Sequence, residues 1–125
     1  MTKTKILIVD DELKFLKALE TLLKRENYEV VSANNGELAL KKAKEEKPSL
    51  IILDIRMPGM DGKAVLRKLR EEDGTMFTPV IMLTAVQDKE AITDTIIEGG
   101  AVDYITKPFE DKELIKRVKN VLGKK

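Results

Sequence analysis

Five short apolar runs recur along the chain and are separated by longer segments in which apolar and charged residues alternate. The runs are rich in Val, Ile and Leu and have the length of strands. They cover residues 5–9, 28–33, 49–53, 79–83 and 103–105. Residues 50–53 are apolar at every position, as expected for a central strand that is buried on both faces. The pattern therefore predicts five strands, with the third at the centre of a sheet.

The segments between these runs have the spacing of amphipathic helices. In the first, Leu16, Leu19 and Leu23 recur at intervals of three or four residues, with Phe15 and Leu22 beside them, and Lys and Glu take the other face. The other helices are expected at 37–46, at 63–71, from 88 to Gly99-Gly100, and from 111 onward. Residues that can cap the amino ends of these four helices are, in order, Asn35, Asp61, Asp88 and Asp111.

Strands that alternate with single helices form a parallel sheet through right-handed crossovers, with helices on both faces. We therefore predict an α/β, doubly wound fold with five strands and five helices. The length of 125 residues suits one domain, so residues 1–125 are expected to form a single unit. In such sheets, ligands bind at the carboxyl ends of the strands. Those strand ends are where functional side chains are expected.

The predicted strand ends carry an unusual group of polar side chains. Asp10 and Asp11 follow the first strand, Asp54 follows the third, Thr84 ends the fourth and Lys107 ends the fifth. Three carboxylates held close together repel one another, so they either keep protons or bind a cation. Oxygen ligands of this kind suit Mg²⁺, whose coordination is commonly completed by water and phosphate oxygens. A lysine beside them can pair with one acid at rest and then neutralise a phosphoryl oxygen.

The composition narrows the chemistry that these residues can perform. The chain has 23 basic and 22 acidic side chains, so no overall charge favours nucleic acid or a membrane surface. It has no Cys and no His, which excludes thiolate nucleophiles, Ser-His-Asp triads and Cys-ligated zinc. A carboxylate can accept a phosphoryl group with mainly positioning and charge neutralisation. No apolar run approaches membrane-spanning length, and we expect a cytoplasmic protein that binds neither nucleic acid nor membrane directly.

Four segments, taken in order, resemble the motifs of response-regulator receiver domains. They are VDDE at 9–12, LDIRMPGMDG at 53–62, LTA at 83–85 and YITKPF at 104–109. The resemblance covers essentially the whole chain and implies a flavodoxin-like sheet with strand order 2-1-3-4-5. It also implies that Asp54 is the phosphoacceptor. Mg²⁺ or Mn²⁺ would be held by Asp10, Asp11, Asp54 and the backbone carbonyl of Arg56.

The same resemblance assigns roles around the acceptor. Lys107, Thr84 and Ala85 would contact the phosphoryl group, Thr84 and Tyr104 would form a switch pair, and the Lys107–Pro108 peptide bond would be cis. The phosphodonor would be a histidine kinase or a histidine phosphotransfer protein. The surface of the fourth helix, fifth strand and fifth helix would then select an output protein that the sequence does not identify. A phosphorylation-dependent homodimer through this surface is left open.

Two positions bear on how long the signal lasts. In relatives, the side chains two residues after the acceptor and two after the switch threonine influence hydrolysis of the acyl phosphate, and here they are Arg56 and Val86. Neither is an acid or amide that could orient an attacking water, so slow self-dephosphorylation is expected. The resemblance therefore implies a switch that modifies itself rather than an enzyme with an external substrate. We also expect the chain to act as a stand-alone regulator, similar to the chemotaxis regulators.

Three other interpretations compete with this one. The acids at 10–12 could simply stabilise the start of the first helix through its dipole. A flavodoxin-like FMN module would need a phosphate-cradling loop after the first strand, where this chain has Asp10 and Asp11. A phosphatase of the haloacid dehalogenase type would carry a second Asp two positions after its nucleophile, where this chain has Arg56.

Overall fold

The computed structural model describes residues 3–85, 89–93 and 99–123 of the chain. The described residues form five strands in one parallel sheet, in the order β2-β1-β3-β4-β5. This confirms the parallel sheet and the strand order that the resemblance implies. The strands are β1 (Lys5–Val9), β2 (Glu29–Ala33), β3 (Leu50–Asp54), β4 (Val80–Ala85) and β5 (Asp103–Lys107).

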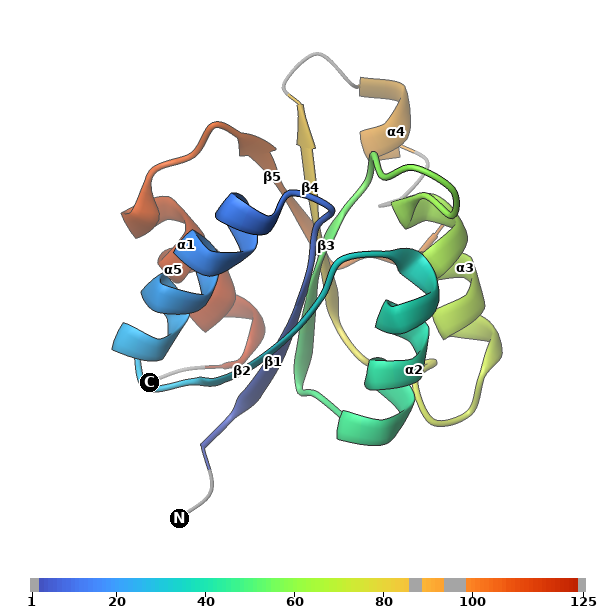
Figure 1. Cartoon of the computed structure of the whole chain (residues 1–125), viewed down its shortest axis with the longest axis horizontal. Coiled ribbons are helices and arrows are strands. Elements are labelled where there is room, and N and C mark those ends of the chain that lie inside the picture. Colours follow the sequence, from blue (N-terminus) through green and yellow to red (C-terminus); the bar gives the residue numbers. More distant parts are fainter. Residues whose placement is uncertain (1–2, 86–88, 94–98, 124–125) are drawn as a thin grey trace.

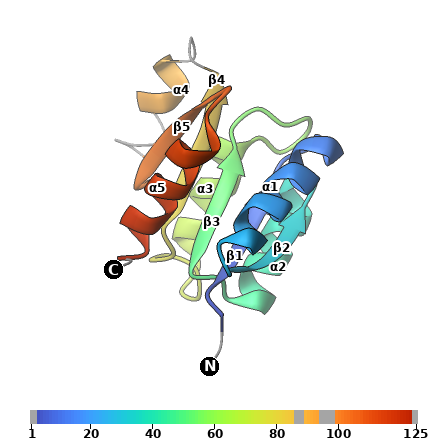
Figure 2. The same cartoon turned by 90° about the vertical axis from the view of Figure 1, so that its left-hand side faces the viewer.

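Within the described residues, four helices of ten residues or more flank the sheet: α1 (Leu13–Arg25), α2 (Gly36–Glu46), α3 (Gly62–Glu71) and α5 (Asp111–Val121). Helices α1 and α5 lie on one face and α2 and α3 on the other (Figure 1). The view turned by 90° shows α1 and α5 side by side in front of the strands (Figure 2). None of the helices in the described ranges is long and apolar enough to cross a membrane.

The predicted fourth helix is only partly described. A short helix, α4, spans Lys89–Thr93. Its predicted cap, Asp88, and residues 94–98 lie outside the described residues. The extent of this helix toward Gly99 and Gly100 therefore stays a prediction.

The sheet separates two apolar cores, because side chains alternate between the two faces of each strand. Leu7, Ile51 and Met82 belong to the core beneath α2 and α3. Their neighbours Ile8 and Ile52 belong to the core beneath α1 and α5. Every residue of β3 is buried, which confirms the prediction of a central strand covered on both sides.

Two of the predicted helix caps are confirmed and one is wrong. Asn35 Oδ1 accepts a hydrogen bond of 2.8 Å from the backbone N–H of Leu38, at the start of α2. Asp61 Oδ1 likewise accepts from the N–H of Ala64 at 3.0 Å, at the start of α3. The sequence predicts Asp111 as the cap of α5, but Asp111 is the first helical residue and Glu110 is the N-cap. Both positions carry a carboxylate, so the local pattern did not distinguish the cap from the first turn.

Replacing the two capping side chains tests these boundaries. Asn35→Ala and Asp61→Ala are each expected to lower the free energy of unfolding by about 1 kcal/mol, because an N–H of the first turn loses its acceptor. The measurement is urea denaturation at neutral pH. Asp111→Ala serves as the control and should cost less than about 0.5 kcal/mol, since its charge only favours the helix dipole. An equal loss for Asp111→Ala would contradict the corrected start of α5.

Candidate functional site

The alternation of side chains along the strands brings three charged groups to one place. Ile8 in β1, Ile52 in β3 and Ile105 in β5 belong to the core beneath α1 and α5. The residues two positions after these isoleucines lie on the same side of the sheet, because side chains alternate along a strand. They are Asp10, Asp54 and Lys107, respectively. Because parallel strands end at the same edge of the sheet, these side chains converge there. The carboxyl-end site predicted from the sequence is therefore formed.

The distances show a compact acidic cluster with one cation. One carboxylate oxygen from each of Asp10, Asp11 and Asp54 lies within 4.8 Å of the others. Asp10 and Asp54 are buried, at 1% and 6% exposure, while Asp11 is exposed. Lys107 Nζ lies 2.8 Å from Asp10 Oδ2 and 3.5 Å from Asp54 Oδ1. The lysine therefore pairs with the acids at rest, as predicted.

The electrostatics of this cluster are not balanced by the lysine alone. Burial of the Asp54 carboxyl, followed by the charge of Asp10, raises the pKa of Asp54 to about 6, although Lys107 acts in the opposite direction. Burial disfavours the Lys107 ammonium, but its hydrogen bond to Asp10 and the charges of Asp54 and Asp10 outweigh this and raise its pKa. A site that retains excess negative charge favours a further cation.

Asp10 connects the cluster to the turn between β1 and α1. Its backbone N–H donates to the carbonyl of Ala33 at 3.2 Å, and its Oδ1 accepts from the N–H of Glu12 at 2.9 Å. Its Oδ2 is the oxygen that binds Lys107. Because α1 begins only at Leu13, Asp10 lies before the first turn. Because its carboxylate binds Lys107, Asp10 does more than interact favourably with the dipole of α1.

Gly62 lets α3 begin directly against the backbone of Asp54. Its N–H donates to the carbonyl of Ile55 at 2.7 Å. A Cβ at position 62 would lie 2.3 Å from the carbonyl oxygen of Asp54 and 2.7 Å from Ile55 Cα. Only a glycine fits this approach without a shift of backbone. The sequence predicted a turn at Asp61-Gly62 but not this contact, which depends on strand and helix meeting.

The predicted switch residues lie on one face of neighbouring strands. Tyr104 pairs in register with Met82, two residues before Thr84, so Thr84 and Tyr104 are diagonal neighbours. Thr84 is 2% exposed and its Oγ1 donates to the carbonyl of Ala85 at 3.3 Å, whereas Tyr104 is 36% exposed. Ala85 ends β4 opposite Lys107. A buried hydroxyl therefore lies beside an aromatic side chain that reaches the surface.

Two further predicted features can be located, and a third lies outside the described residues. The Lys107–Pro108 peptide bond is cis. Arg56 is exposed in the loop between β3 and α3. Val86 lies outside the described residues.

One contact of the site was missed from the sequence. Lys107 Nζ lies 4.4 Å from the centroid of the Phe15 ring. The spacing of Phe15 fits the apolar stripe of α1, and this pattern predicts only a core residue. The chain offered no local signal for this contact, because 92 positions separate the two residues in the sequence.

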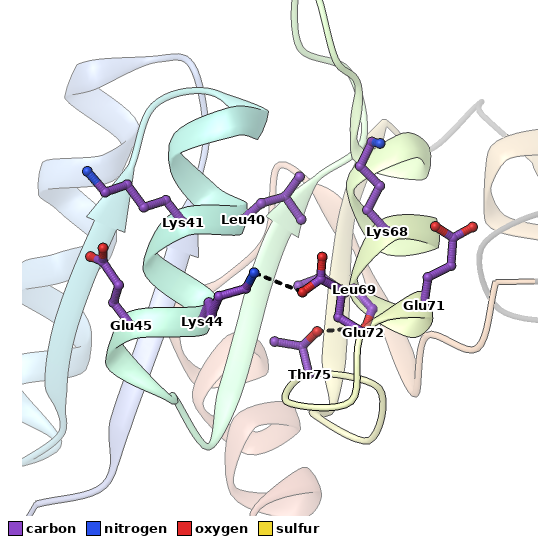
Figure 3. A pocket seen from close by; sticks show the side chains of 9 residues that line it. All are labelled: Leu40, Lys41, Lys44, Glu45, Lys68, Leu69, Glu71, Glu72 and Thr75. Carbon is purple, nitrogen blue, oxygen red and sulfur yellow. Dashed lines mark hydrogen bonds and ion pairs between the residues drawn. The ribbon is translucent and has the colours of Figure 1, made fainter.

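A second hollow lies away from the acids, between α2 and α3 (Figure 3). It has a volume of about 480 Å³. An ion pair of 3.0 Å between Lys44 and Glu72 crosses it. Its rim mixes both signs of charge, with Lys41 and Lys68 near Glu45 and Glu71. This groove therefore has no charge preference that would select a ligand, and the acidic cluster remains the candidate site.

Comparison with known proteins agrees with this site. The response regulator receiver domain family matches residues 6–119. The transcriptional regulatory protein PhoP of Bacillus subtilis is 46% identical over 118 residues, which are 94% of this chain and 48% of PhoP. A putative response regulator from Chloroflexus aurantiacus superposes with a TM-score of 0.91 at 39% identity, covering 98% of this chain and all of that one.

A third relative is the receiver domain of the sensor histidine kinase PA1611 from Pseudomonas aeruginosa, whose structure has a magnesium ion coordinated in the active site cleft. It superposes with a TM-score of 0.87 at 27% identity, over 98% of this chain and 99% of that domain.

The fold and the acidic edge thus define a phosphorylatable signalling module, and the chain belongs to the response-regulator receiver domains. Phosphorylation on an aspartate is the general function of this family. Neither the FMN module nor the phosphatase is supported by these relatives. The chain spans about half the length of the curated relatives it matches, such as PhoP. The expectations of a single-domain and stand-alone regulator therefore stay predictions.

Proposed function

We propose that Asp54 is the phosphoacceptor and that Asp10, Asp11, Asp54 and the backbone carbonyl of Arg56 hold Mg²⁺ or Mn²⁺. The observation that carries this proposal is the convergence of three carboxylate oxygens within 4.8 Å, with Lys107 beside two of them. Carboxylate oxygens with residual negative charge suit a hard divalent cation. The magnesium ion in the PA1611 receiver domain supports the same choice of metal.

The proposed transfer requires no general base. A carboxylate oxygen of Asp54 attacks the phosphorus of a phosphohistidine on a histidine kinase or a histidine phosphotransfer protein. The new P–O bond forms as the P–N bond breaks, and the imidazole leaves with the electron pair and takes a proton from water. Lys107 offsets charge on the phosphoryl oxygens, and bound Mg²⁺ supplies further positive charge at the site. A chain without His can therefore perform this step.

We further propose that Thr84 and Tyr104 transmit the new charge. Thr84 Oγ1 donates a long hydrogen bond of 3.3 Å to the backbone carbonyl of Ala85, and it can exchange that weak bond for one to a phosphoryl oxygen. The space it leaves lies next to Tyr104 on the same face of the sheet. An inward turn of Tyr104 would change the surface formed by α4, β5 and α5. This surface would then select the output partner or a second copy of the chain.

The test of this function uses a small-molecule donor in place of the kinase. We expect the purified protein to gain one phosphoryl group in intact mass when it is incubated with acetyl phosphate and Mg²⁺. EDTA should prevent the gain, because the acids then repel the donor. A protein that gains no phosphoryl group, although Mg²⁺ binding is verified, would show that this proposal is wrong.

Removing the lysine charge should slow the reaction strongly. Lys107→Met keeps an unbranched apolar side chain but removes the ammonium, and the rate of phosphorylation by acetyl phosphate is expected to fall by about 10²- to 10³-fold. The matched control is Lys119→Met, whose ammonium pairs instead with Glu26 at 3.2 Å. An unchanged rate in Lys107→Met would exclude Lys107 from the reaction.

We propose that the phosphorylated protein loses its group slowly and turns over no external substrate. The exposed Arg56 side chain is not an acid or amide that could orient water toward the acyl phosphate. The phosphorylated, Mg²⁺-bound protein should therefore persist for minutes or longer when its mass is followed with time. Arg56→Asn introduces an amide and should shorten this lifetime. Hydrolysis of the unaltered protein within seconds would refute the proposal.

A further inference from the structure

The Lys107 ammonium has a third neighbour besides the two acids. Its nitrogen lies 4.4 Å from the centroid of the Phe15 ring, and it is over the ring. This distance is within the range in which the negative face of an aromatic ring attracts a cation. An ammonium has three N–H groups. Asp10, Asp54 and the Phe15 ring together offer three acceptors for the N–H groups of Lys107.

A second aromatic ring orients the first. Phe109 packs against Phe15 in an edge-to-face arrangement, with the centroids 5.8 Å apart and the planes at 78°. Phe109 follows Lys107 by two residues, so the residue that supports the Phe15 ring lies just beyond the strand end that carries the lysine. A hollow of about 230 Å³ borders both rings. Phe15 is therefore not enclosed by the core, and its contacts with Phe109 and Lys107 matter for its position.

We propose that Phe15 is a positioning residue, whose ring face holds the Lys107 ammonium within reach of Asp54 while the acids change their charge. This inference rests on the phosphoacceptor function proposed above. At rest, the ammonium is held mainly by Asp10 at 2.8 Å, with Asp54 at 3.5 Å. Once the acids bind a divalent cation, their negative charge is shared with it, and their attraction for the ammonium falls. The charge distribution of the ring does not change in this way, so its attraction persists.

The need for such a holder follows from the lysine side chain itself. It has a flexible four-carbon stem, and a strongly hydrated ammonium at a partly open site gains free energy by turning to water. The Lys107 side chain is 27% exposed, so this route is open. A leucine at position 15 would fill similar space but would offer no negative face. The proposal therefore concerns the electrostatics of the ring and not its bulk.

The experiment changes the ring electrostatics without changing the fold. Phenylalanine at position 15 is replaced in steps by 4-fluoro-, 3,5-difluoro- and pentafluorophenylalanine, which weaken the negative face while nearly keeping the ring size. The rate of phosphorylation by acetyl phosphate is measured at saturating Mg²⁺. We expect the rate to fall at each step, to a total between about twofold and thirtyfold, which corresponds to the usual strength of a cation–π contact. Phe15→Trp should retain most of the rate.

A matched control and a second readout complete the design. The same fluorinated residues at Phe77, which is 87% exposed in the loop after α3, should leave the rate unchanged. Separately, the Lys107 Hε protons of the metal-free protein should show an upfield ring-current shift in NMR spectra, lost in Phe15→Leu. A flat rate series at position 15 would overturn this inference while leaving the acceptor function intact. Failure of the unaltered protein to accept a phosphoryl group would instead refute the proposed phosphoacceptor function, on which this inference rests.

Discussion

Asp54→Asn is expected to abolish phosphorylation and at the same time to make the metal-free protein more stable at pH 7. The amide has nearly the shape of the carboxylate but carries no negative charge. Burial and the charge of Asp10 raise the pKa of Asp54 to about 6, so its ionised form is disfavoured in the folded protein. Removing that charge should increase the free energy of unfolding by about 1–2 kcal/mol, less than the full change in pKa implies, because the exposed Asp11 and the partly exposed Lys107 leave the site open to screening by solvent.

The pH dependence of this stability gives the sign of the effect. An unfolded aspartate has a pKa of about 4. Between about pH 4 and pH 6 the folded protein therefore holds a proton that the unfolded chain has released. The stability contributed by Asp54 is fully present below this window and is lost as pH rises through it. Urea denaturation with EDTA should show the advantage of Asp54→Asn at pH 7 and little difference near pH 4.

A matched replacement separates this effect from a general loss of charge. Asp73 is exposed in the loop after α3, and Asp73→Asn should change the free energy of unfolding by less than about 0.5 kcal/mol. A lower stability of Asp54→Asn than of the unaltered protein at pH 7, in the absence of metal, would contradict this prediction. That result would mean that Lys107 overcompensates the burial of the carboxylate.

Gly62→Ala should be strongly destabilising, although alanine is the better helix former by about 1 kcal/mol. Its Cβ would lie 2.3 Å from the carbonyl oxygen of Asp54 and 2.7 Å from Ile55 Cα. Both atoms belong to the backbone, so they cannot move aside as a side chain can. We expect a loss of about 2–4 kcal/mol in the free energy of unfolding. Phosphorylation should also slow, because the added Cβ forces a shift of the backbone at Asp54 and so displaces the acceptor carboxylate.

Gly74 offers the control for this replacement. No heavy atom of the described residues lies within 4 Å of the Cβ that an alanine would add there. Gly74→Ala should therefore be neutral or slightly stabilising, since it only restricts the unfolded chain. The free energies of unfolding of both variants are compared by chemical denaturation. Equal stability of Gly62→Ala and the unaltered protein would show that α3 is not packed against Asp54 as described.

The elements and the acidic edge were predictable because they depend on local periodicity. Alternation along the strands and the ends of the apolar runs were enough to bring Asp10, Asp54 and Lys107 to one edge. Which strands pair is not contained in that periodicity, and the strand order came from the resemblance to receiver domains. The Asp111 cap was placed one residue late because Glu110 presents the same carboxylate before the same helix.

The contacts that could not be predicted are those between distant segments. Phe15 has the spacing of a core residue, and only the folded chain shows its ring beside Lys107. The sequence predicts Gly62 only as a turn residue, and its close approach to the backbone of Asp54 depends on how α3 packs against the end of β3. Both features refine the position of groups that the sequence had already identified. They concern how precisely the site is held rather than which residues form it.

Chemical trapping can identify directly the carboxylate that carries the phosphoryl group. The protein is phosphorylated with acetyl phosphate and Mg²⁺ and then treated with borohydride, which reduces an aspartyl phosphate to homoserine. Peptide mass spectrometry then locates the altered residue. We predict homoserine at position 54 alone, with Asp10 and Asp11 unchanged. Homoserine at position 10 or 11, or phosphate on a hydroxyl such as that of Thr84, would contradict it.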